Sequence, residues 1–168
     1  MPATTTKAQE HQSRWQEIVG DPALRDLPYK VETNARGQLV LSPHTTRHSR
    51  QQKAIQKKLD QLLSGGEAFS EWPIATAGGT KQADVIWTSN QRLQEMDETG
   101  DPPTLAPVIC VEVMSESNDW DEMEKKRRLY LDAGAEEVWV VTEEGEVHFF
   151  QEEKIEQSTL VPNFPERL

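Results

Sequence analysis

The sequence contains a single cysteine, Cys110, among 168 residues. One thiol cannot form an internal disulfide bond, and it cannot supply a zinc site that needs several thiolates. The sequence also lacks an apolar run of the roughly 18 residues that a membrane-spanning helix requires. Residues 1–7 are polar and contain no apolar core of a secretory signal. These absences favour a cytoplasmic protein that has no membrane partner.

Basic residues are scarce, because 18 Lys and Arg stand against 29 Asp and Glu, for a net charge of −11. This balance argues against an extended nucleic-acid surface, since phosphates bind to basic surfaces. Residues 47–58 are an exception, with basic side chains and no acidic one: Arg47, Arg50, Lys53, Lys57 and Lys58. Arg50, Lys53 and Lys57 share one face of the predicted helix. That face is either simply solvated or a contact for nucleic acid.

The order of predicted elements indicates a single α/β (α+β) domain over residues 1–168, with a mixed β-sheet flanked by helices. Helices are predicted at residues 8–19, 45–63 and 120–132, and a β-hairpin at 29–33 and 38–41. Further strands are predicted at 67–76, 82–88, 108–114, 137–142 and 146–150. Residues 89–103 are predicted to be a polar loop, either without regular structure or with one helical turn around Arg92 to Met96. The strand–helix–strand order over residues 107–142 predicts a parallel crossover. Residues 1–7 are expected to be disordered, and residues 151–168 to form a peripheral tail.

Glu112 lies inside residues 108–114, a run rich in Val and Ile that predicts a buried strand. A buried carboxylate is costly unless it is protonated or finds a partner. Lys126 is one candidate partner, because at 100° per residue it lies at the margin of the inward face of helix 120–132. Asp84, near the start of strand 82–88, is another acid to consider, although an acid in that position is commonly only a turn or cap residue.

Two carboxylates on neighbouring strands can bind a hard divalent cation such as Mg²⁺ or Mn²⁺. Such a cation lowers the pKa of a bound water and neutralises charge on a phosphodiester, while an ammonium can stabilise the developing negative charge. Asp84, Glu112 and Lys126 would together supply these parts of a metal-dependent phosphodiesterase.

His48 begins the inward face of helix 45–63, which continues through Ile55, Leu59 and Leu62. It is either a site residue or a partly buried histidine bonded to a carbonyl group. The four histidines of the chain show no spacing typical of a zinc site.

Three segments resemble the PD-(D/E)xK nuclease superfamily, and more narrowly its Uma-type restriction-endonuclease family. They are Gln82–Val85, Val111–Ser115 and Lys126–Tyr130, followed by Gly134 and Glu137–Trp139. The resemblance extends over roughly residues 29–150.

This resemblance implies a restriction-endonuclease-like core in which Asp84 and Glu112 bind Mg²⁺ (or Mn²⁺) and Lys126 assists catalysis. It also implies accessory roles for His48, Ser115 and Tyr130. Met114 stands where the superfamily usually carries its lysine, which the Uma-type pattern moves to the following helix.

Three hypotheses remain open at this point. The first is a Mg²⁺-dependent endonuclease that cuts DNA as a homodimer, since two-fold symmetry suits the cutting of both strands. The second is a non-catalytic nucleic-acid-binding or regulatory module that retains the nuclease fold. The third is an oligomeric protein in which Glu112 and Lys126 form a buried ion pair.

Overall fold

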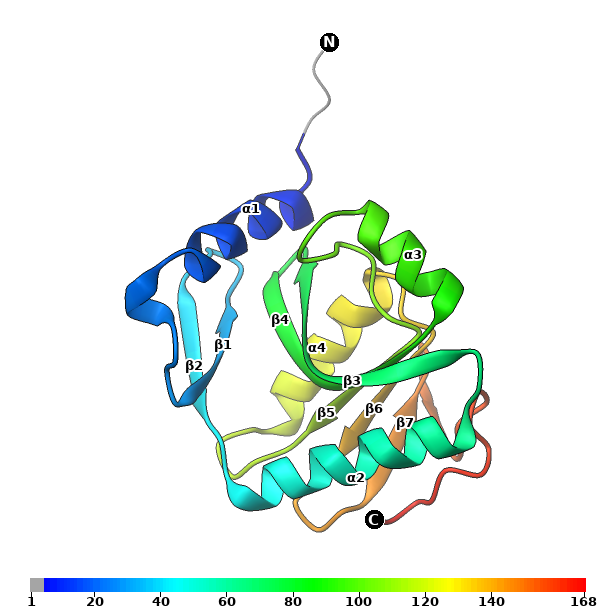
Figure 1. The fold of residues 1–168 in the computed structure, drawn as a ribbon. Coiled ribbons are helices and arrows are strands. Elements are labelled where there is room, and N and C mark those ends of the chain that lie inside the picture. Colours follow the sequence, from blue (N-terminus) through cyan, green and yellow to red (C-terminus); the bar gives the residue numbers. More distant parts are fainter. Residues whose placement is uncertain (1–4) are drawn as a thin grey trace.

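Six strands form one sheet in the order β3-β4-β5-β6-β7-β8 (Figure 1). The computed structural model describes residues 5–168 of the chain. The strands β5 and β6 run parallel, and the other neighbouring pairs run antiparallel. Their bounds are β3 Gly66–Thr76, β4 Gly79–Ser89, β5 Ile109–Val113, β6 Glu137–Val141, β7 Val147–Phe150 and β8 Lys154–Ile155. The parallel pair confirms the crossover that the sequence predicts, and Pro73 lies in β3, on an edge of the sheet, where a missing N–H is tolerated.

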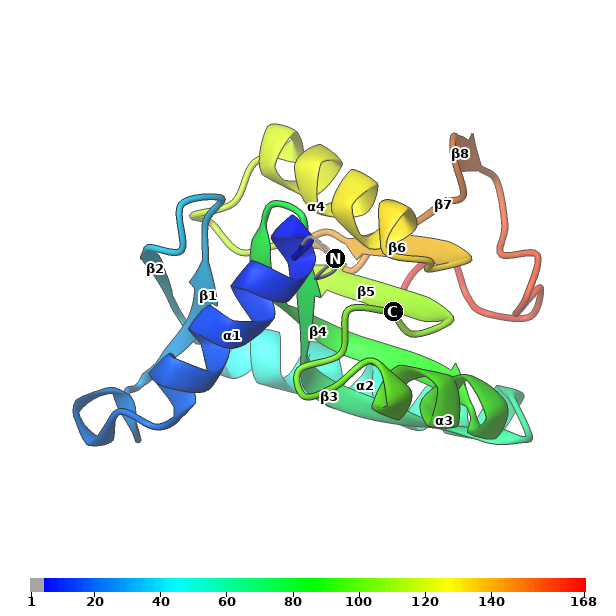
Figure 2. The same ribbon diagram turned by 90° about the horizontal axis from the view of Figure 1, so that it is seen from above.

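Helices α2 (Thr46–Leu62) and α4 (Trp120–Asp132) cover opposite faces of this sheet (Figure 2). Ile55 and Leu59 of α2 are fully buried against one face, and Tyr130 of α4 is fully buried against the other. Leu62, which periodicity places on the inward side of α2, is instead 39% exposed because the helix ends there. The mixed sheet with helices on both faces confirms the predicted fold class.

Two further helices pack on the β3–β4 side of the sheet: α1 (Lys7–Val19) contacts β3 and β4, and α3 (Asn90–Glu98) contacts β4. Thr6 caps α1 in a capping box with Gln9, so the disorder expected for residues 6 and 7 is wrong, because the cap satisfies the first backbone N–H groups. Residues 1–4 lie outside the described part of the chain. Helix α3 includes the helical turn considered around Arg92 to Met96 and replaces most of the predicted loop at 89–103. Ser89 caps it, and its own residue Met96 is fully buried.

A separate two-stranded sheet consists of β1 (Tyr29–Thr33) and β2 (Leu39–Pro43), which confirms the predicted hairpin. The turn between β3 and β4 ties this hairpin to the main sheet. Gly79 has a φ of 118°, and a Cβ at this position would overlap the carbonyl oxygen of Thr33. The backbone N–H of Thr80 then donates to the Thr33 hydroxyl over 2.8 Å. The close backbone approach that glycine permits therefore brings β1 against β4.

Residues 151–168 are not a peripheral tail throughout, so that expectation is corrected. Strand β8 pairs with β7, and Val161 and Phe164 are 2% and 4% exposed. The ring of Phe164 packs against Trp139 with a centroid distance of 4.6 Å. Val161 and Phe164 complete the hydrophobic core on the side of α2. The expectation of a peripheral tail rested on the acidic, proline-containing composition of the segment, which does not indicate these two buried side chains. Within residues 5–168, no helix has both the length and the apolar character needed to cross a membrane.

Candidate active site

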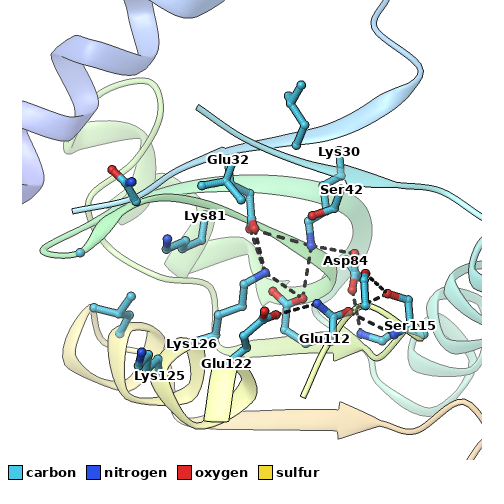
Figure 3. Close-up of a pocket in the computed structure, with 18 of the residues that line it drawn as sticks. Lys30, Glu32, Ser42, Lys81, Asp84, Glu112, Ser115, Glu122, Lys125 and Lys126 are labelled. Carbon is cyan, nitrogen blue, oxygen red and sulfur yellow. Dashed lines mark hydrogen bonds and ion pairs between the residues drawn. The ribbon is translucent and has the colours of Figure 1, made fainter. Parts of the chain in front are cut away.

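A cavity of about 790 Å³ opens between the β1–β2 hairpin, α4 and the first turn of α2 (Figure 3). Charged side chains from five elements meet in its wall: Lys30, Glu32, His48, Asp84, Glu112 and Lys126. Five of these six side chains belong to buried residues, and Lys126 is half-buried. Their ionisation is therefore governed by one another rather than by water.

Asp84 lies in β4 and is 1% exposed. Its Oδ2 accepts the backbone N–H of Val113 over 2.7 Å and lies 3.4 Å from Nε2 of His48. Its Oδ1 accepts from Nζ of Lys30 over 3.0 Å and from the amide of Gln52 over 3.3 Å. Burial by itself raises the pKa of Asp84, but the Lys30 ammonium and His48 outweigh it and hold this pKa well below its usual range. Asp84 is therefore a carboxylate at neutral pH.

Glu112 lies in the middle of β5 and is 2% exposed. Its Oε1 accepts a 2.6 Å hydrogen bond from the hydroxyl of Tyr130, on α4. Its Oε2 faces Nζ of Lys30 at 3.3 Å and Nζ of Lys126 at 3.5 Å. Burial raises the pKa of Glu112 to about 7, although Lys126 and Lys30 act in the opposite direction. The predicted buried carboxylate and its lysine partner are thus both present, within a larger network.

Lys126 is held mainly by Glu32, whose two carboxylate oxygens lie 2.9 and 3.0 Å from Nζ. Glu32 is itself fixed by the backbone N–H of Gln82 in β4, over 2.7 Å. Burial raises the pKa of Glu32, but the ammonium groups of Lys30 and Lys126 outweigh it and lower this pKa. The helix lysine therefore reaches the cavity already paired, with Glu112 as its second neighbour.

The structure brings together Asp84, Glu112, Lys126, His48 and Tyr130 from the residues that the sequence singles out. Contact with the charge of Asp84 raises the pKa of His48, although burial lowers it; its Nδ1 is buried and finds no partner among the described residues.

Ser115 lines the cavity, but its hydroxyl is engaged with the side chains of Asn118 and Ser117, over 2.9 and 3.0 Å. These contacts fix the turn that leads from β5 into α4. Arg50, Lys53 and Lys57 are exposed on α2, and none of the three lines this cavity.

Lys30, Glu32 and Gln52 are site residues that the sequence reasoning missed. Gln52 lies one turn after His48, so the helical period that places His48 inward could have found it. Lys30 and Glu32 alternate in β1 and share one face, which is a detectable pattern. The sequence does not reveal that the hairpin turns this face toward the main sheet.

The donor set fits a hard divalent cation. No three His, Cys, Asp or Glu side chains within residues 5–168 are grouped to hold a metal ion. Two carboxylates nevertheless suffice for Mg²⁺, which binds oxygen ligands and keeps several of its waters. Asp84 and Glu112 each direct one oxygen at the buried ammonium of Lys30. A positive charge, that of Lys30, thus already lies between the two carboxylates.

The fold is similar to that of one solved structure. A crystal structure described as a "putative nuclease belonging to DUF820", from Anabaena variabilis, matches with a TM-score of 0.60 at 14% sequence identity. The match covers 80% of this chain and 73% of the other. At this identity the similarity establishes the fold alone.

The family follows from the sequence itself. Residues 21–167 match the model of the Uma2 family, described as "putative restriction endonuclease". The chain therefore belongs to the Uma2 family, which confirms the Uma-type resemblance. No curated protein matches the chain.

Proposed function

We propose that this protein is a metal-dependent endonuclease that hydrolyses phosphodiester bonds of DNA, with Mg²⁺ or Mn²⁺ as its cofactor. The observation that carries the proposal is that one oxygen of Asp84 and one of Glu112 face the same buried ammonium, that of Lys30, in the wall of an open cavity. A second ammonium, that of Lys126, lies beside Glu112 in the same wall. Membership of the Uma2 family and a nuclease-like fold support this reading.

Asp84 and Glu112 would hold the metal through Oδ1 and Oε2, the oxygens that face the cavity cations. The bound metal would lower the pKa of a water and neutralise charge on the phosphodiester. Val113 and Tyr130 keep the other oxygen of each carboxylate occupied, so both carboxylates are held in orientation before any ligand arrives. Such preorganisation costs no rearrangement during the reaction.

Lys126 would stabilise the negative charge that develops on the phosphate as water attacks phosphorus and the P–O bond breaks. Glu32 would position it for this role, because Glu32 makes its shortest contacts. His48 would orient Asp84 rather than contact the DNA, since its Nε2 points to Oδ2.

DNA contacts beyond the cavity would come from Arg50, Lys53 and Lys57, which lie on the exposed face of α2, opposite the buried face that begins at His48. A homodimer would suit the cutting of both strands. The free edge of the hairpin offers a surface for it, because within residues 5–168 β2 pairs with β1 alone and contains no charged residue. Edges of that kind tend to pair with another strand. A monomer in sedimentation at micromolar concentration would contradict the dimer.

The test is cleavage of supercoiled plasmid in the presence of Mg²⁺, Mn²⁺ or EDTA. Wild-type protein should nick or linearise the plasmid only with a metal, and Asp84→Asn, Glu112→Gln and Lys126→Met should each lose this activity by at least about a hundredfold. Glu98→Gln, an exposed acid on α3, should cut like the wild type. Binding of DNA without cleavage by the wild type would instead favour the non-catalytic module.

A further inference from the structure

Lys30 occupies a central position in the site. Its Nζ lies 3.0 Å from Oδ1 of Asp84, 3.3 Å from Oε2 of Glu112 and 3.8 Å from Oε2 of Glu32 (Figure 3). The residue is only 9% exposed, so these three carboxylates, and not water, compensate its charge. A lysine placed there must therefore be considered together with any metal that uses the same carboxylates.

Lys30 contacts one oxygen of each carboxylate, and of these two oxygens only Oδ1 of Asp84 has a further donor among the described residues besides the lysines, the amide of Gln52 at 3.3 Å. Oδ2 of Asp84 is held by the backbone of Val113, and Oε1 of Glu112 is held by Tyr130. Oδ1 and Oε2 consequently turn toward a common point, and the ammonium lies there. A divalent cation bound to the same two oxygens and a lysine ammonium cannot share this point, because like charges at such short range repel strongly.

We propose that Lys30 is the resident counter-cation of the metal site: its ammonium holds Asp84 and Glu112 together until a divalent cation displaces it, and it then keeps only Glu32 as a partner. This inference rests on the proposed metal site and adds to it an exchange of one cation for another. Its expected consequence is that metal affinity is set by competition with a side chain of the protein itself.

Lys126 does not compete in the same way. Within the described chain it contacts Glu112 at 3.5 Å and Glu32 at 2.9 Å, and it makes no ion pair with Asp84. Its contact with Glu112 is at Oε2, the oxygen assigned to the metal, but both carboxylate oxygens of Glu32 lie 2.9 and 3.0 Å from its Nζ. Lys126 can therefore keep Glu32 as its partner when a metal binds. The two lysines thus differ in role: Lys30 neutralises Asp84 and Glu112 when no metal is bound, and Lys126 remains next to the metal site through its contact with Glu32.

The first test measures Mn²⁺ binding to the purified full chain by titration calorimetry, with no DNA present. Lys30→Met should bind Mn²⁺ about tenfold more tightly than the wild type, or more, the size of an ordinary coupling between two ligands. Lys154→Met removes the same charge from an exposed position of β8, outside the cavity, and should change affinity by less than about threefold, since exposed charges are screened. Equal effects of these two variants, or weaker binding by Lys30→Met, would overturn the proposal.

The second test needs no variant and so does not depend on the folding of Lys30→Met. Wild-type protein is acetylated with an amine-reactive ester, with and without saturating Mn²⁺, and the modified lysines are quantified by mass spectrometry. Lys30 should react several times faster with Mn²⁺, because it has lost two of its three partners, while the exposed Lys154 should react at the same rate in both. A Lys30 rate that is unchanged or slower with bound Mn²⁺ would overturn the proposal.

These readouts separate the inference from the proposed function. Tighter Mn²⁺ binding by Lys30→Met, together with a wild type that cuts no nucleic acid, would support the counter-cation and refute the nuclease. Metal-dependent cleavage by the wild type, together with a Mn²⁺ affinity that Lys30→Met does not change, would support the nuclease and refute the counter-cation. Absence of Mn²⁺ binding by the wild type and by Lys30→Met at millimolar concentration would refute both.

Discussion

The hydroxyl of Tyr130 donates a 2.6 Å hydrogen bond to Oε1 of Glu112, across the interface between α4 and β5. Both side chains are almost completely buried, so no water can replace this donor. We expect Tyr130→Phe to lower the free energy of unfolding by about 1–3 kcal/mol, the usual cost of a buried polar group without its partner. Urea unfolding of the metal-free protein measures this change.

Tyr29→Phe is the matched control, because Tyr29 is the second tyrosine of the chain and is 44% exposed. Its effect should stay within about 0.5 kcal/mol. The loss in Tyr130→Phe should also be larger at pH 8 than at pH 5, since hydrogen bonds to an ionised carboxylate are the stronger ones. Equal stability of the two variants would show that the hydroxyl contributes nothing to holding Glu112.

The local patterns of the sequence predict this part of the site well. A carboxylate in an apolar strand signals Glu112, and the helical period of α4 brings Tyr130 and Lys126 toward it. What the sequence does not reveal is how separate pieces dock. Lys30 and Glu32 reach the site only because the hairpin packs on β4, which is a tertiary contact that strand alternation does not encode. Phe164 is missed for the same reason, since its packing on Trp139 is a tertiary contact and the flanking Pro162 and Pro165 give no strand or helix period.

The ionisation of Glu112 predicts how stability depends on pH. Burial raises the pKa of Glu112 to about 7, whereas an unfolded glutamate titrates near pH 4.3. Between these values the folded chain binds the additional proton, so the free energy of unfolding falls as the pH rises from about 4 to about 7. The contribution of Glu112 to this fall is at most about 4 kcal/mol.

Glu112→Gln cannot release a proton, so its unfolding free energy should fall less over the same pH range. The comparison is made by urea unfolding at several pH values for both proteins without metal. The lowered pKa of Asp84 acts in the opposite sense, but its stabilisation is lost only below about pH 4, outside this range. Parallel pH profiles for the wild type and Glu112→Gln would contradict a raised pKa.

Gly79 is predicted to be essential for docking the hairpin that carries Lys30 and Glu32. Gly79→Ala forces a side chain into a φ of 118° and against the Thr33 carbonyl oxygen, so we expect a loss of about 3 kcal/mol in unfolding free energy. Thermal or urea unfolding measures it.

Gly65→Ala provides the control, because Gly65 also has a positive φ, 76°, but a Cβ there meets no atom within 4 Å. It should cost only about 1 kcal/mol, the price of the backbone conformation alone. Two variants of equal stability would mean that the hairpin is not held by this close approach. Gly79→Ala should also abolish metal-dependent cleavage at temperatures where the protein remains folded. In this variant the hairpin no longer packs on β4, so Glu32 no longer contacts Lys126.

The exposed cations of α2 predict a salt dependence of DNA binding. If Arg50, Lys53 and Lys57 each contact a phosphate, the slope of log affinity against log salt becomes shallower by about 2.7 when all three are replaced by serine, since each neutralised phosphate contributes about 0.9. Binding is measured by fluorescence anisotropy in the Asp84→Asn background, so that cleavage does not interfere.

The acidic surface of this protein makes that measurement decisive. With a net charge of −11, non-specific attraction to DNA is weak, and the few cations that do contact phosphates should dominate the salt slope. Serine at the exposed Lys154 of β8 should leave the slope unchanged. If the α2 variant also keeps the wild-type slope, the duplex does not extend along α2, and its phosphates contact the rim of the cavity instead.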